Sequence, residues 1–63
     1  MPALSFREQE ILEVLNKLGG EAHPTRIGQE MGISPDYAEQ LADYMVWKKH
    51  FVRNGLKFQI VEE

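Results

Sequence analysis

The stretch of residues 25–45, TRIGQEMGISPDYAEQLADYM, constrains the fold most, because it predicts two helices joined by a tight turn. Gly32 suits the end of the first helix, where a left-handed residue is adopted at little steric cost. Ser34 is a good N-cap for the second helix, and Pro35 fits its first position, where an N–H is not needed. The second helix then has one apolar stripe at the helical period, formed by Ala38, Leu41, Ala42 and Met45.

A further helix is predicted before this stretch. Ser5 and Glu8 have the spacing of a capping box, and an apolar pattern of helical period follows them. Gly19 and Gly20 would end that helix. Three helices are therefore expected, at Phe6–Leu18, from Pro24 or Thr25 to Met31, and from Pro35 to Lys48 or Lys49.

The end of the chain changes to the period of a strand. Leu56, Phe58 and Ile60 alternate with other residues, as in a half-buried strand. Asn54-Gly55 is a strong signal for a two-residue hairpin turn. Such a turn would pair Arg53 with Leu56, Val52 with Lys57 and Phe51 with Phe58, and Phe51 and Phe58 would close the core.

The intervals between Gly28, Gly32 and Ile33 carry a resemblance to the helix-turn-helix family. A small residue at position 28 lets the second helix approach closely, and Ile33 fills the corner of the turn. With its flanks, the chain resembles a winged-helix domain. The resemblance implies an α+β fold over residues 1–63 as a single domain, with three helices, a C-terminal two-stranded wing hairpin and a short third strand at residues 21–23.

Composition excludes several functional classes. The chain has 63 residues, a net charge of −3 and no cysteine, which fits a reducing cytoplasm but does not favour nucleic-acid binding. No signal peptide is visible, and no apolar run approaches the ~20 residues that span a bilayer. His23 and His50 are the only histidines, so neither a metal site nor another cofactor is expected. Ser5 and Ser34 are explained as helix caps, and we expect no enzymatic activity.

Charge along the sequence favours DNA binding by one end of the domain. Residues 48–57 contain four cations and no acid, which predicts a basic end on an acidic body. The resemblance implies a transcriptional regulator that contacts double-stranded DNA with the start of the third helix and with the wing. The residues expected to contact DNA at the start of the third helix are Ser34, Tyr37 and Gln40. Contacts to phosphates are expected from Arg26, Lys48, Lys49, Arg53 and Lys57.

The alternative is a protein-interaction module, because some winged helices are docking domains. The outer face of the third helix is acidic, and Trp47 falls opposite its apolar stripe. Exposed tryptophan is typical of interaction sites, so Trp47 is expected to be exposed in the monomer and buried against a partner, which a second copy would also provide. The residues of this alternative site are Asp36, Gln40, Asp43 and Trp47.

Overall fold

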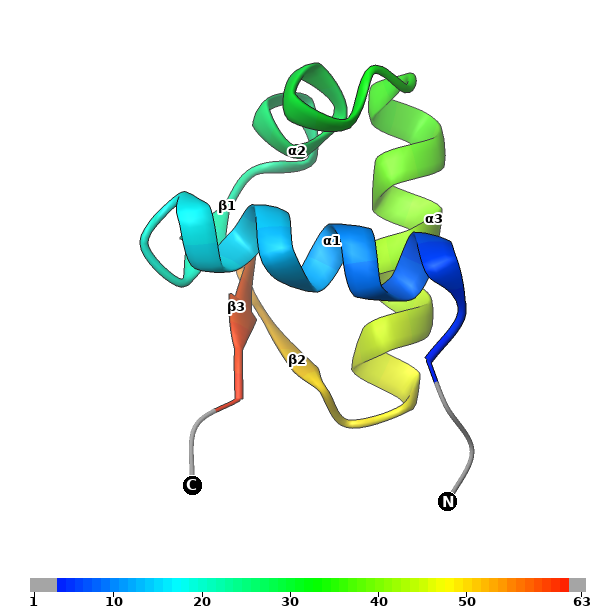
Figure 1. Ribbon diagram of the computed structural model, residues 1–63. Coiled ribbons are helices and arrows are strands. Elements are labelled where there is room, and N and C mark those ends of the chain that lie inside the picture. Colours follow the sequence, from blue (N-terminus) through cyan, green and yellow to red (C-terminus); the bar gives the residue numbers. More distant parts are fainter. Residues whose placement is uncertain (1–3, 62–63) are drawn as a thin grey trace.

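The computed structural model describes residues 4–61 and contains three helices and a three-stranded antiparallel sheet (Figure 1). In chain order the elements are α1 (Phe6–Lys17), β1 (Glu21–Ala22), α2 (Pro24–Met31), α3 (Pro35–Trp47), β2 (Phe51–Asn54) and β3 (Lys57–Ile60). The predicted α+β class, the C-terminal hairpin and the short third strand are confirmed. The helix ends agree with the predicted ends within one or two residues.

The helix starts follow from local hydrogen bonds. The capping box predicted at the start of α1 is present, because Ser5 and Glu8 each accept a hydrogen bond from the backbone N–H of the other. Ser34 caps α3 by accepting from the N–H of Tyr37 at 3.1 Å. The cap of α2 was not predicted: Nδ1 of His23 accepts from the N–H of Thr25 at 3.1 Å.

All three helices end in the same hydrogen-bond pattern. An N–H beyond the helix donates to the carbonyl five residues earlier, from Gly20 to Leu15, from Ile33 to Gly28 and from His50 to Met45. The residue before each donor has positive φ. At the ends of α1 and α2 this residue is glycine, but at the end of α3 it is Lys49, with φ 68°.

The hairpin turn lies one residue later than predicted. Asn54 pairs with Lys57, so Gly55 and Leu56 form the turn, and Phe51 lies opposite Ile60 instead of Phe58. Gly55 has φ 67° and Leu56 has negative φ, as in a type II′ turn. A type I′ turn at Asn54-Gly55 would need positive φ at both residues. Leu56 therefore leaves the strand and is 68% exposed.

The sheet keeps its predicted faces, because moving the turn by one residue changes each cross-strand partner by two. Phe51 and Phe58 are both buried, as expected. The strand order is β1-β3-β2, so β3 is the central strand. Residue 21 pairs with Gln59, and Ala22 pairs with Phe58.

The core lies where the helices meet the sheet, and α1 crosses in front of it (Figure 1). A close approach between α2 and the start of α3 passes over Gly28, where an added Cβ would lie 2.7 Å from the carbonyl oxygen of Ile33. No helix within residues 4–61 is long and apolar enough to cross a membrane. The buried apolar side chains are Ile11, Leu15, Ala22, Ile27, Met31, Ala38, Ala42, Met45, Phe51 and Phe58.

Candidate functional site

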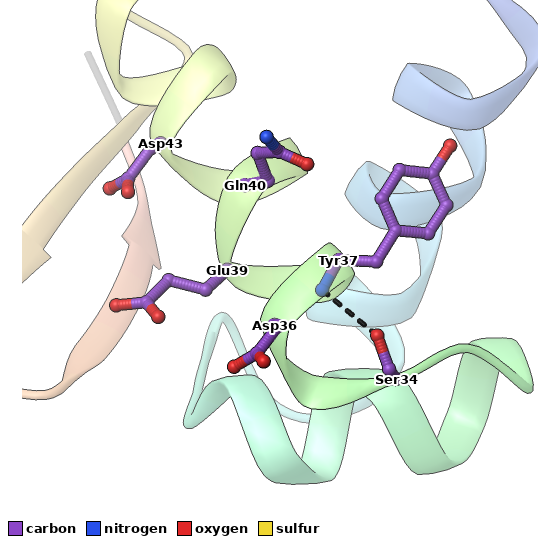
Figure 2. A pocket seen from close by; sticks show the side chains of 6 residues that line it. All are labelled: Ser34, Asp36, Tyr37, Glu39, Gln40 and Asp43. Carbon is purple, nitrogen blue, oxygen red and sulfur yellow. Dashed lines mark hydrogen bonds between the residues drawn. The ribbon is translucent and has the colours of Figure 1, made fainter.

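The exposed surface of α3 has two faces that differ in chemistry. In Figure 2 the carboxylates of Asp36, Glu39 and Asp43 point toward the side where the hairpin strands lie, whereas Tyr37 points to the other side. We call the surface formed by Asp36, Glu39, Asp43 and Arg53 the hairpin-side face. The surface formed by Tyr37, Leu41, Tyr44 and Trp47 is called the aromatic face.

The hairpin-side face is organised by Arg53 of β2. Its Nη2 donates to Oε2 of Glu39 at 2.8 Å, and its Nη1 donates to Oδ1 of Asp43 at 3.1 Å. The guanidinium also lies over the ring of Phe58, 5.0 Å from its centroid. The hydrogen bond to Glu39 and the charge of Asp43 raise the pKa of Arg53 above its ordinary value. The hairpin and α3 are thus joined by ion pairs that water still reaches, so each pair stabilises the fold only modestly.

The aromatic face has apolar side chains that the described part of the chain leaves uncovered. Trp47 is 75% exposed, as predicted, and its ring stacks on Tyr44 with 6.0 Å between centroids. Tyr37 and Tyr44 are also exposed, and half-buried Leu41 lies between them in the sequence. These three residues, with Gln40 and Asp43, line an open hollow of about 460 Å³.

An ion pair joins α1 to Lys48, the residue that follows α3, beside the ring of Tyr44. Nζ of Lys48 lies 2.9 Å from Oε2 of Glu8 and 4.8 Å from the centroid of the Tyr44 ring. Glu8 is buried, and its Oε2 has no hydrogen bond of good geometry, so the ammonium charge of Lys48 compensates it. The backbone hydrogen bond from Ser5 and the contact with Lys48 lower the pKa of Glu8.

The predicted basic end is not an uncompensated cluster of cations, which corrects the expectation from the sequence. Acids from other segments form ion pairs with these cations. Glu8 pairs with Lys48, and Glu39 and Asp43 both pair with Arg53. Nζ of Lys57 lies 3.9 Å from Glu21. Six of the seven Lys and Arg residues have a carboxylate within 4 Å, and Lys49 forms no ion pair within residues 4–61.

The structure brings some of the predicted contact residues together and separates others. Ser34, Tyr37 and Gln40 line one hollow at the start of α3 with the three acids (Figure 2). Lys48 and Lys49 lie beyond the opposite end of the helix. Arg26 is on α2, where it pairs with Glu30 at 3.4 Å.

Sequence reasoning missed the burial of Glu8 and the stacking of Tyr44 on Trp47. Glu8 was explained by its capping box, which does not show that its second oxygen contacts Lys48. The stack between Tyr44 and Trp47 had a signal, because residues three apart on a helix are neighbours. The pairing of Arg53 with Glu39 and Asp43 depends on how the hairpin lies against α3, for which the sequence has no local signal.

The surface of α3 has no metal site among the described residues, and comparison with known proteins gives no function for it. Within residues 4–61, no group of three or more His, Cys, Asp or Glu side chains is placed to hold a metal ion. His23 is used as a helix cap. No family model, curated protein or solved structure matches the chain.

Proposed function

We propose that this chain is a protein-interaction module that binds a partner protein through the aromatic face of α3. The observation that supports this proposal most is the stacked pair of Tyr44 and Trp47, with Trp47 75% exposed. Burying a large apolar side chain stabilises a complex by about 1.5–3 kcal/mol. Tryptophan and tyrosine are also enriched among the residues that dominate interface energetics.

Charge supports a protein partner over a nucleic acid. Phosphate binding needs cations that are free to replace the counterions of the duplex. Here Arg53 is held by two carboxylates and Lys48 by one, so phosphates would have to replace existing ion pairs. The carboxylates of Asp36, Glu39 and Asp43 would also repel the duplex wherever α3 entered a groove.

Site-specific photo-crosslinking in cells that produce the protein tests this proposal. Benzoylphenylalanine replaces Trp47 in one variant and the exposed Glu13 of α1 in a control variant. We expect a protease-sensitive, nuclease-resistant adduct from position 47 and none from position 13. A nuclease-sensitive adduct from position 47 would overturn the proposal, as would equal protein adducts from both positions.

The second candidate function is binding of double-stranded DNA as a transcriptional regulator, which the resemblance to winged helices implies. It is favoured by the exposed Ser34, Tyr37 and Gln40 at the start of α3 and by Lys49, which has no ion pair among the described residues. A cytoplasmic location is part of both proposals.

If DNA is bound, affinity falls with salt, and Lys48→Glu combined with Arg53→Glu abolishes binding to any duplex sequence. These two changes also break ion pairs, so Lys49→Glu is the cleaner variant. Fluorescence anisotropy with a labelled duplex measures both effects. If the parent protein leaves the anisotropy unchanged even at low salt, this second candidate is wrong.

A further inference from the structure

We infer that the partner of the aromatic face is a cationic amphipathic segment of another protein. It would insert an apolar side chain between Tyr37 and Tyr44 and place Lys or Arg against Asp36 and Asp43. This inference rests on the proposed function and adds the chemistry of the partner.

The apolar part of the inference comes from the hollow on α3. Tyr37, Leu41 and Tyr44 recur at intervals of four and three residues, so they form one stripe along the helix. Trp47 continues this stripe for another turn, stacked on Tyr44. A helical segment that carries apolar residues at similar intervals matches such a stripe.

The charged part comes from the two edges of the stripe. On one edge lies the hairpin-side face, where three carboxylates and one guanidinium leave two negative charges. Asp36 forms no ion pair within residues 4–61, and Asp43 also lines the apolar hollow. On the other edge Lys48 is paired with Glu8, and this pair carries no net charge. A partner therefore meets apolar side chains beside a negative edge, which favours cations in the partner.

The same charge argues against a second copy of this chain as the partner. A two-fold symmetric contact places the same surface of both copies together. The negative hairpin-side face would then lie near its own equivalent, and like charges in a contact oppose association. The whole chain also carries a net charge of −3, which adds to the repulsion. A segment with Lys or Arg beside its apolar residues avoids this cost.

The test uses two designed 14-residue helical peptides that share a leucine stripe, one with lysine and one with glutamate at all other positions. Each is titrated into the purified, ¹⁵N-labelled full chain, and binding is followed by amide chemical shifts. We expect the lysine peptide to shift Tyr37, Leu41 and Tyr44 and to bind at least about tenfold more tightly than the glutamate peptide.

Three variants separate the apolar from the charged contribution. Tyr44→Ser should weaken binding of the lysine peptide about tenfold at any salt concentration. Asp36→Asn combined with Asp43→Asn should weaken it severalfold at low salt and little at high salt. The control, Glu10→Gln combined with Glu13→Gln on α1, removes the same charge and should leave the affinity unchanged. A melting curve for each variant shows that it is folded.

The inference is overturned if both peptides bind equally, if neither binds, or if the shifts lie outside the aromatic face. It is also overturned if sedimentation shows that the free protein dimerises and that Trp47→Ser abolishes the dimer, because the occupant is then a second copy. None of these results affects the crosslinking test of the proposed function. A nuclease-sensitive adduct from position 47 would instead refute the proposed function, and the inference with it.

Discussion

The two faces of α3 differ in where their side chains find partners. Two of the three acids of the hairpin-side face have a partner within the chain, because Arg53 donates to both Glu39 and Asp43. No residue in the range 4–61 covers the aromatic face, where Trp47 and Tyr44 stack on each other. Ion pairs within the chain, such as those of Arg53, contribute to the position of the hairpin. An uncovered apolar face gains free energy only from another molecule.

The comparison also shows which sequence patterns mislead. A count of charges along residues 48–57 finds four cations and no acid, yet three of these cations have acids beside them in the fold. Ion pairs form across space, so a local count overstates the charge of a surface. The helical period, in contrast, correctly predicted that Trp47 points away from the core. It grouped Trp47 with the acids of α3, whereas in the structure the indole stacks on Tyr44.

The largest expected effect is the loss of stability caused by Gly28→Ala, because this change displaces the start of α3, which carries both faces. The added Cβ would lie 2.7 Å from the backbone oxygen of Ile33, so the start of α3 must shift away from α2. Overpacking of this kind costs about 1–3 kcal/mol, which lowers the melting temperature of so small a domain by at least ~4 °C. The exposed neighbour Gln29→Ala is the control, and an unchanged melting temperature for Gly28→Ala would contradict the close approach.

Lys49→Gly should stabilise the folded protein by relieving backbone strain at the end of α3. Lys49 has positive φ in the position where α1 and α2 use glycine. Removing its Cβ relieves about 1 kcal/mol of backbone strain. The reciprocal variant Gly19→Lys, at the equivalent position after α1, should destabilise by a similar amount. Chemical denaturation measures both, and equal signs for the two variants would refute the comparison.

Low pH should destabilise the fold by protonating Glu8, which then loses its ion pair with Lys48. The pKa of Glu8 is lowered in the folded protein, so its contribution is fully present above the ordinary value of 4.5 and is lost as pH falls through the folded pKa. The melting temperature should therefore drop below about pH 4.5, and Glu8→Gln should drop less than the parent. Glu30, whose pKa is lowered by Lys17, accounts for part of the remaining drop. Glu13→Gln is the control, and a pH profile of Glu8→Gln identical to that of the parent would exclude this role.

Glu39→Gln combined with Asp43→Asn should release Arg53 on the hairpin-side face. The change removes two negative charges and frees one guanidinium, so non-specific duplex affinity at low salt should rise severalfold. The control is Glu13→Gln combined with Asp36→Asn, which changes the net charge equally and leaves Arg53 paired with Glu39 and Asp43. If the control raises the affinity as much as the test variant, net charge explains the gain and the local compensation by Glu39 and Asp43 does not.

The smallest expected effect is that of Trp47→Ser on stability. An indole that is 75% exposed buries little area in the monomer, so the change should cost less than about 0.5 kcal/mol. A buried tryptophan would cost several times more. The parent should also show the emission maximum of a water-exposed indole at dilutions where it is monomeric. A blue-shifted maximum there would mean that Trp47 is covered within the chain.

The sequence by itself determined the elements and much of the core. Several features follow from interactions within one or two helical turns, which a sequence pattern records. They are the helix starts at Ser5 and Ser34, the helix end at Gly32 and the exposed side of Trp47. The hairpin was predicted, but its turn was misplaced by one residue, because Asn54-Gly55 and Gly55-Leu56 are both compatible with a two-residue turn.

Only the tertiary structure decided the charge of the candidate site. Glu8 is 40 residues from Lys48 in the sequence, and Glu39 is 14 residues from Arg53, yet each pair is in contact. No local rule predicts such pairs, because they depend on how α1 and the hairpin pack against α3. The sequence therefore showed which side of α3 is exposed. The packing showed that two of its acids pair with Arg53 and that no residue in the range 4–61 covers its aromatic side chains.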